Sequence, residues 1–242
     1  MRFDLHLHSA LSACADNAMS PRRIVDTAAE RGINLLAVAD HNASAHVGLC
    51  ADWAARRGLR LLPAVEITSR EEVHLLAYFF SIEALVDFQS LLDAHLPNLS
   101  NLPDVFGYQV LYDASDEIVG FDERLRQVGS ALSIERLVES VHQREGLIVP
   151  AHVDRSRHGL IAQLGLVDAD AGYDAVEITW TLWRRENHCP GDRAHGYPLV
   201  TGSDAHYLED IGRGGIDLAD PPEHGRSPDT LPGRLAFWKG LS

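Results

Sequence analysis

Short aliphatic runs recur along the chain, and between them apolar residues repeat at helical spacing. Each run is rich in Leu, Ile and Val with few polar interruptions, which is typical of strands buried on both faces of a parallel sheet. The predicted strands cover residues 2–7, 34–39, 60–66, 73–79, 147–152, 175–179 and 198–202.

Helix signals lie between these strands. Ser20-Pro21 predicts a helix start, because Ser is a favoured cap and Pro is favoured at the first helical position. The predicted helices begin after Ser20-Pro21 and after Ser133, end before Gly32 and Gly146, and also cover residues 44–57 and 82–95. Strands that alternate with helices favour a parallel α/β fold.

Residues 81–146 break this alternation and are predicted to be an insertion at one end of the fold. Residues 96–103 have the composition of a loop, and runs at 108–112 and 117–121 flank a polar turn, which predicts a hairpin. The hairpin either shapes substrate choice or is a structural edge, and the sequence leaves both open.

Composition narrows the class of protein. The chain has 242 residues and a formal net charge of −14, with 35 acidic and 21 basic residues. A surface that binds nucleic acid through its phosphates needs a basic balance, so an extended nucleic-acid partner is disfavoured. The sequence contains no run of 18 apolar residues, so a membrane span is not expected.

The N-terminus and the cysteines predict a cytoplasmic protein. Residues 1–6 become polar too early for a secretory signal. Three cysteines, Cys14, Cys50 and Cys189, form no CxxC pair, which indicates free thiols in a reducing compartment. Oligomeric state is left open by these features.

His6 and His8 lie two residues apart in the first predicted strand. Strand periodicity places both on one face together with Asp4, so the two imidazoles can bind one metal ion. Asp4 is then expected to accept a ring N–H and set the tautomer.

Metal-ligand residue types recur at or near the other predicted strand ends. They are Asp16 after the first strand, Asp40-His41 after the second, Glu66, His74, His152, and Asp204 and His206 after the last. The C-terminal strand ends of a parallel barrel meet at one rim, so these residues are expected to converge. Imidazoles with carboxylates suit zinc, manganese or iron, and Glu66 is the candidate bridge between ions.

Six motifs in this order resemble the PHP (polymerase and histidinol phosphatase) superfamily. They are Asp4-Leu5-His6-Leu7-His8-Ser9, Asp16 before Pro21, Ala39-Asp40-His41-Asn42, Glu66-Ile67 with His74 to Phe79, Pro150-Ala151-His152, and Gly202-Ser203-Asp204-Ala205-His206. Ala39 stands where many relatives have Thr, and Val153-Asp154 where Pro-Gly is common.

The resemblance implies one domain over residues 1–242, a distorted (β/α)₇ barrel with its active site at the C-terminal strand ends. It also implies two or three divalent ions (Mn, Zn or Fe). The implied ligands are His6, His8, Glu66 and Asp204 for the first ion, Glu66, His74 and His152 for the second, and Asp16, His41 and His206 for the third. Arg155 matches a position where similar phosphoesterases hold phosphate.

The favoured function is hydrolysis of a small phosphorylated metabolite or nucleotide by a metal-bridging hydroxide. Asp204 or His206 is expected to pass a proton to the leaving oxygen. A metal-dependent carbonyl hydrolase of the amidohydrolase kind needs the same ions but not Arg155. If the chain were a non-catalytic regulatory module, at least one of the metal-ligand positions would be expected to be lost, and none is missing. Trp180 and Trp183 are expected either to line a base or sugar pocket or to pack in the core.

Overall fold

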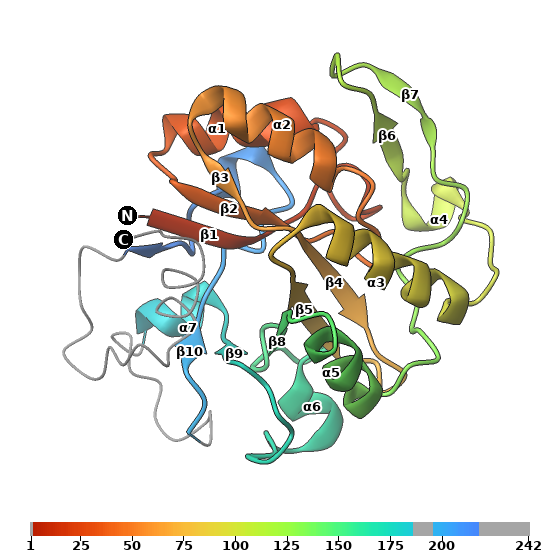
Figure 1. The fold of residues 1–242 in the computed structure, drawn as a ribbon, viewed down its shortest axis with the longest axis vertical. Helices are drawn as coiled ribbons and strands as arrows, with labels where there is room; N and C mark the ends of the chain where they lie inside the picture. The colour runs from red at the N-terminus through yellow and green to blue at the C-terminus, as the bar shows by residue number, and fades with distance from the viewer. Residues whose placement is uncertain (1, 186–195, 218–242) are drawn as a thin grey trace.

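The strands lie in four separate sheets within residues 2–185 and 196–217, which the computed structural model describes (Figure 1). The first sheet has the order β11-β1-β2-β3. Strands β1, β2 and β3 run parallel, and β11 is antiparallel to β1. Their bounds are Arg2–Leu7 for β1, Leu35–Val38 for β2, Arg60–Leu61 for β3 and Ile216–Asp217 for β11.

The second sheet has the order β4-β5-β8, and β5 runs antiparallel to both neighbours. The third pairs β9 with β10 in parallel, and the fourth is the hairpin of β6 and β7. Their bounds are Ala64–Thr68 for β4, His74–Tyr78 for β5, Val110–Tyr112 for β6, Ile118–Phe121 for β7, Leu147–Pro150 for β8, Val176–Glu177 for β9 and Leu199–Val200 for β10.

Two sequence expectations about the sheet are wrong. The run 60–66 forms two strands, because Pro63 lacks the N–H that a continuous strand needs. The strands are also not all parallel, and within the described ranges they form no single closed sheet, so the predicted (β/α)₇ barrel is not confirmed. The fold class that the structure supports is a mixed α/β fold.

A few backbone hydrogen bonds join the sheets near the ends of the strands. Asn42 donates to the carbonyl of Glu66 at 2.7 Å, and Asp204 donates to the carbonyl of His6 at 2.8 Å. Val153 donates in the same way to the carbonyl of Glu177 at 2.9 Å. The predicted ligands therefore come together although the sheets are separate.

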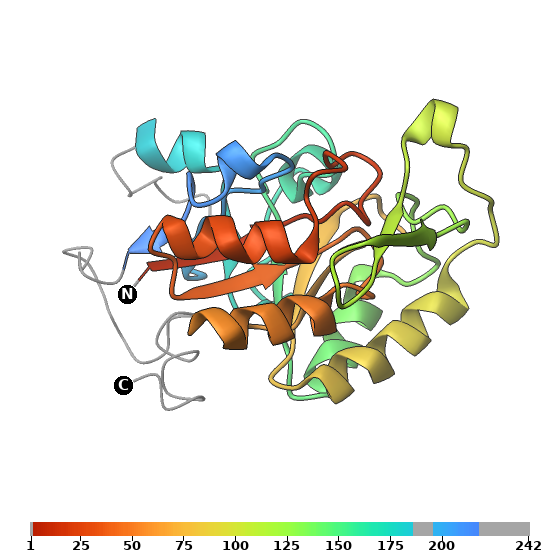
Figure 2. The ribbon, with the colours of Figure 1, turned by 90° about the horizontal axis from the view of Figure 1, so that it is seen from above.

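Helices cover the outer faces of the two larger sheets (Figures 1 and 2). Apolar residues of α1 and α2 pack with Leu36 and Val38 of β2, and those of α3 and α5 pack with Ile67 and Leu75. In the described ranges no helix is long and apolar enough to cross a membrane. The helices are α1 (Pro21–Glu30), α2 (Val47–Arg57), α3 (Ile82–His95), α4 (Pro103–Phe106), α5 (Ile134–His142), α6 (Leu160–Leu164), α7 (Trp180–Arg185) and the 3₁₀ turn η2 (Leu208–Asp210).

A shared core lies between the two larger sheets. Phe3 and Leu5 of β1 belong to the same buried cluster as Leu76 and Tyr78 of β5. The Tyr78 hydroxyl donates a hydrogen bond to the carbonyl of Leu5 at 3.0 Å, which satisfies its polar end in this apolar surrounding. Each sheet is thus buried on both faces, as its aliphatic strands predict.

The predicted hairpin is confirmed, and it stands to one side of the two larger sheets (Figures 1 and 2). It contacts the loop that follows β1. Val110 donates a backbone hydrogen bond to Ala10 at 2.8 Å, and the Tyr112 hydroxyl donates to the carbonyl of Asn17 at 2.8 Å. Gly107 approaches the same loop so closely that a Cβ there would lie 2.2 Å from the carbonyl oxygen of Ala13.

Gly107→Ala should therefore destabilise the fold. Gly107 has a φ of +98°, which an L side chain rarely adopts, and the added methyl would collide with backbone. Strain of this kind costs about 1–3 kcal/mol, and denaturant unfolding would measure it. Gly120→Ala, in β7 with open space around its Cβ, is the matched control. Equal stability of the two variants would contradict the close approach.

Candidate metal centre

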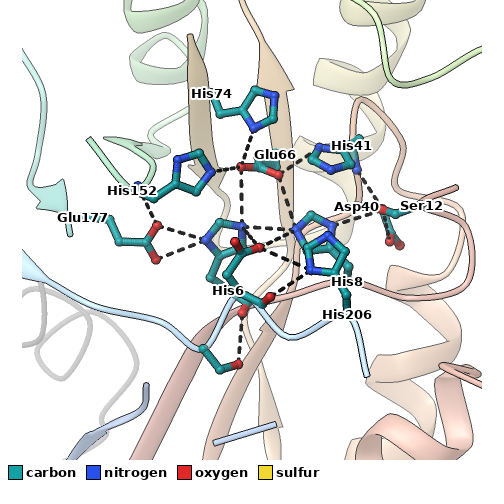
Figure 3. A network of polar contacts seen from close by, with 12 residues as sticks. His6, His8, Ser12, Asp40, His41, Glu66, His74, His152, Glu177 and His206 are labelled. Carbon is teal, nitrogen blue, oxygen red and sulfur yellow. Dashed lines mark hydrogen bonds and ion pairs between the residues drawn. The ribbon is translucent and has the colours of Figure 1, made fainter. Parts of the chain in front are cut away.

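Glu66 lies at the centre of a cage of imidazoles (Figure 3). It is completely buried in the middle of β4 rather than at a strand end. Its Oε1 is 3.0 Å from His74 Nδ1 and 3.1 Å from His152 Nε2. Its Oε2 is 2.9 Å from His41 Nδ1 and 3.3 Å from His8 Nε2. Both carboxylate oxygens thus face nitrogen atoms that can bind a cation.

Electrostatics keep this carboxylate ionised. Burial acts to raise the pKa of Glu66, but His74, His41 and His6 outweigh it and hold that pKa well below its usual range. Burial lowers the pKa of His74 to about 4 against the attraction of Glu66, so this imidazole is neutral near pH 7. An ionised carboxylate and a neutral imidazole are the forms that bind metal.

Glu177 orients the first histidine. Its two carboxylate oxygens lie 3.1 and 3.0 Å from His6 Nδ1, and it also accepts the backbone N–H of His152 at 2.9 Å. His6 therefore turns Nε2 toward Glu66, at 3.5 Å, and toward Asp204, at 3.4 Å. A carboxylate behind a histidine fixes its tautomer in metal sites.

Asp4 does not have the predicted role. Its carboxylate accepts the backbone N–H groups of Ser203, at 3.0 Å, and Gly212, at 2.7 Å. It therefore anchors the segment that carries Asp204 and His206 instead of holding an imidazole. Glu177, at the end of another strand, provides that contact to His6.

A second group of imidazoles lies beside Glu66. The centroid of the His8 ring lies 4.5 Å from that of His41 and 4.3 Å from that of His206. The Cys14 thiol lies at this group although the residue is exposed. Burial of the thiol acts to raise its pKa, but hydrogen bonds with His206 and His41 lower the pKa to about 6. Cys14 belongs to no sequence motif, and only its closeness to Asp16 along the chain pointed to the site.

Three overlapping groups have ligand atoms close enough to hold metal ions. They are His6, His8 and Glu66; His41, Glu66 and His74; and His8, His41 and His206. The groups fit cations because the buried His41 Nδ1 and Glu66 Oε2, although 2.9 Å apart, do not meet in hydrogen-bond geometry, and neither has another hydrogen-bond partner in residues 2–185 and 196–217. His152 and Asp204 lie beside these groups.

Asp16 is the predicted ligand that the structure does not bring in. Its side chain is exposed and accepts the backbone N–H of Ala18 at 2.7 Å, although its own N–H donates to the carbonyl of His206 at 2.9 Å. The loop is thus near the third group while the carboxylate faces away. No group of three ligands in the described ranges contains it.

A cavity of about 190 Å³ opens over the centre. Arg155 lines it together with the candidate ligands, and its guanidinium pairs with Asp204. Asp154 accepts both the backbone N–H and the hydroxyl of Thr179, at 2.8 and 2.5 Å, which attaches the arginine's loop to the start of α7.

His158 is a cavity residue that the motifs did not assign. Its ring stacks on His74 with centroids 4.3 Å apart, and it lines the same cavity as Arg155. Its Nδ1 lies 3.1 Å from the carbonyl of Glu72, so the ring N–H there is held by backbone. Its only sequence signal is its place shortly after a predicted strand end.

Comparison with known proteins supports the motif resemblance. A family model described as PHP-associated matches residues 193–231. The 3′,5′-nucleoside bisphosphate phosphatase of Chromobacterium violaceum is 40% identical over 75 residues, which are 30% of this chain and 25% of that protein. The match thus spans a quarter of this curated relative.

Two solved structures share the fold over most of the chain. An amidohydrolase from Chromobacterium violaceum, with bound sulfate and no metal, has a TM-score of 0.58 at 25% identity and is covered to 92%, against 91% of this chain. A lesion-specific endonuclease from Pyrococcus furiosus has a TM-score of 0.62 at 18% identity over 100% of this chain and 57% of its own.

A mixed α/β fold with a carboxylate inside a histidine cage defines a protein built to hold divalent cations. The chain resembles the PHP superfamily in its ordered motifs, and both the PHP-associated match and the phosphatase relative agree with that resemblance.

Glu66→Ala should remove metal from two of the three ligand groups, because two of them contain Glu66. Elemental analysis and manganese titration of the metal-free protein would measure this loss. Glu72→Ala is the control, since Glu72 lines the cavity but belongs to none of the groups. Full metal content in the Glu66 variant would rule out a central role for this carboxylate.

Proposed function

We propose that the chain is a metal-dependent phosphoesterase that hydrolyses a small phosphorylated metabolite or nucleotide. The observation that carries the proposal is that the Arg155 side chain lines the same cavity as the candidate metal ligands. Metal ligands and a guanidinium around one cavity suit phosphoester hydrolysis, because both the ions and the arginine would stabilise charge on the phosphoryl oxygens. The bisphosphate phosphatase relative supports the same class of reaction.

The proposed ligands are the nine residues assigned by the resemblance, in two or three sites. They are His6, His8, Asp16, His41, Glu66, His74, His152, Asp204 and His206. Bound manganese, zinc or iron would lower the pKa of a water molecule and neutralise phosphoryl charge. For the third site, Asp16 has to rotate from Ala18 toward His206, and Cys14 is an additional side chain within reach.

Arg155 binds and orients the phosphoryl group in this proposal. Its guanidinium now pairs with Asp204, so phosphate oxygens would replace or share that contact. Asp204 and His206 remain the two candidates for passing a proton to the leaving oxygen. His206 Nδ1 lies 2.8 Å from the carbonyl of Asp204, which leaves Nε2 for a metal or a proton.

A metal-dependent carbonyl hydrolase is the second candidate, favoured by the amidohydrolase whose structure resembles this chain. It would use the same ligands but would not need a guanidinium in the cavity. The acidic balance of the chain disfavours long nucleic acids as substrate. The role of Arg155 therefore separates the two enzymes.

Arg155→Ala should lower kcat/KM for a phosphoester about ten- to a hundredfold, since a hydrogen bond to a charged group contributes roughly 1.5–3 kcal/mol. Arg155→Lys should recover part of the loss, because an ammonium cannot reproduce the two-pronged contact. Rates on a panel of phosphomonoesters and diesters, with metal content measured in parallel, provide the test.

Arg157→Ala is the matched control, because Arg157 is exposed on the same loop and does not line the cavity. Wild-type rates for Arg155→Ala on the best phosphoester would remove the phosphate role and favour the carbonyl hydrolase.

A second cavity of about 170 Å³ shares Arg155, Asp204 and His152 with the first. Its other wall includes Trp180 and Thr181 at the start of α7. A phosphoester held at Arg155 could therefore place its leaving group against this wall. An indole offers a flat face for a nucleobase, so we propose that the leaving group is a nucleoside.

Trp180→Ala should raise KM for nucleoside monophosphates but not for ribose 5-phosphate, which has no base to stack. Loss of base stacking is worth about 1–3 kcal/mol, or roughly 5- to 150-fold. Trp180→Phe should restore part of the difference. Trp53→Ala, on α2 against Arg22 and Arg56, is the control. An equal change for both substrates would argue against a base-binding wall.

A further inference from the structure

A continuous chain of buried hydrogen bonds runs from the hairpin to His8 (Figure 3 shows its inner part). It begins at His46, which is 1% exposed and stands at the N-cap position of α2. The backbone N–H of Tyr112, in β6, donates to His46 Nε2 at 3.1 Å. His46 Nδ1 lies 2.8 Å from the hydroxyl of Ser9.

The direction of each hydrogen bond follows from its partners. Because Nε2 of His46 accepts from Tyr112, its ring proton is on Nδ1 and is donated to Ser9 Oγ. Ser9 in turn donates its hydroxyl proton to Asp40 Oδ2 at 2.5 Å. Burial lowers the pKa of His46 despite the charges of Asp40 and Asp116, consistent with this neutral tautomer.

On the side of the metal centre, Asp40 accepts a second serine hydroxyl, that of Ser12. The hydroxyl of Ser12 donates to Asp40 Oδ1 at 2.7 Å, so Ser12 Oγ can only accept from His8 Nδ1, 3.1 Å away. His8 is thereby protonated on Nδ1, and its Nε2 lone pair faces Glu66 and Asp204. This is the tautomer that a metal ligand needs.

We infer that His46 is a positioning residue through which the hairpin holds His8 in its metal-binding orientation. Asp40 is the junction: one oxygen fixes Ser12 beneath His8, and the other fixes Ser9, which His46 holds against β6. The hairpin then supports the metal centre rather than only bordering it. The inference rests on the metal site of the proposed function but not on its substrate, because every measurement below is metal binding or a ring-proton signal.

The test compares manganese and zinc affinity of the metal-free protein across variants. Ser12→Ala removes the direct partner of His8 and should weaken one site by roughly 10- to 100-fold, as loss of a group behind a ligand does. His46→Ala should weaken the same site toward the lower end of that range. Its effect should disappear in the Ser12→Ala background, because serial contacts are not additive.

Two conservative variants separate the ends of the chain. His46→Asn places its amide near Nδ1 and keeps the donor to Ser9 but loses the acceptor for Tyr112. His46→Gln places its amide near Nε2 and keeps that acceptor but loses the donor to Ser9. Both should weaken the site, and the His8 Nδ1–H signal in the NMR spectrum should shift or broaden in both. His142→Asn, at the exposed end of α5 against Asp174, is the control.

The outcomes decide the inference. Unchanged metal affinity in His46→Asn and His46→Gln would overturn it, and so would losses from His46→Ala and Ser12→Ala that simply add. Weakening only in His46→Gln would also overturn it, because the hairpin contact would then be irrelevant. A wild-type protein that bound no metal would instead refute the proposed function itself, and the inference would fall with it.

Discussion

The structure depends on one buried carboxylate. An ionised carboxylate removed from water and left unpaired costs several kcal/mol or more, so Glu66 is tolerable only with compensating groups around it. The imidazoles of His74, His152, His41 and His8 supply part of that compensation. They come from four different segments, which have to bring these side chains to the same place. The short sheets, the joining backbone bonds and the strand directions all serve that convergence.

The sequence predicted the ends of the strands better than it predicted how the strands pair. Aliphatic runs ending in His or Asp predicted the neighbourhood of most ligands, and the structure brings them together. The direction of β5 was missed, although the signal was present: only residues 69–73 separate it from β4, too few for the crossover that a parallel pair needs. Because β5 is antiparallel to both neighbours, its first residue, His74, lies beside the last residues of β4 and β8. His74 therefore lies at the same edge of the sheet as the C-terminal ends of those two strands.

The contacts behind the ligands could not be predicted in the same way. Strand periodicity put Asp4 on the same face as His6, but a two-residue repeat predicts only the side of the sheet and not the contact partner. The Asp4 carboxylate instead accepts hydrogen bonds from backbone N–H groups far along the chain. Glu177 ends a predicted strand and was therefore a possible acid behind the ligands, but its pairing with His6 spans 171 residues, and the pairing of His46 with Ser9 spans 37. No local pattern encodes such pairs; they depend on where the chain closes.

Backbone conformation shows how firmly the centre is built. His152 and Asp204 have φ of +31° and +50°, a region that costs a side-chain-bearing residue about 1–3 kcal/mol. Each is held there by a hydrogen bond that its own backbone N–H donates: His152 donates to the Glu177 carboxylate, and Asp204 donates to the carbonyl of His6. A residue keeps such an unfavourable φ only where contacts with its neighbours hold it there. Glu177 contacts both the His6 ring and the His152 N–H, and His6 also accepts from the Asp204 N–H, so candidate ligands far apart in sequence are set in place together.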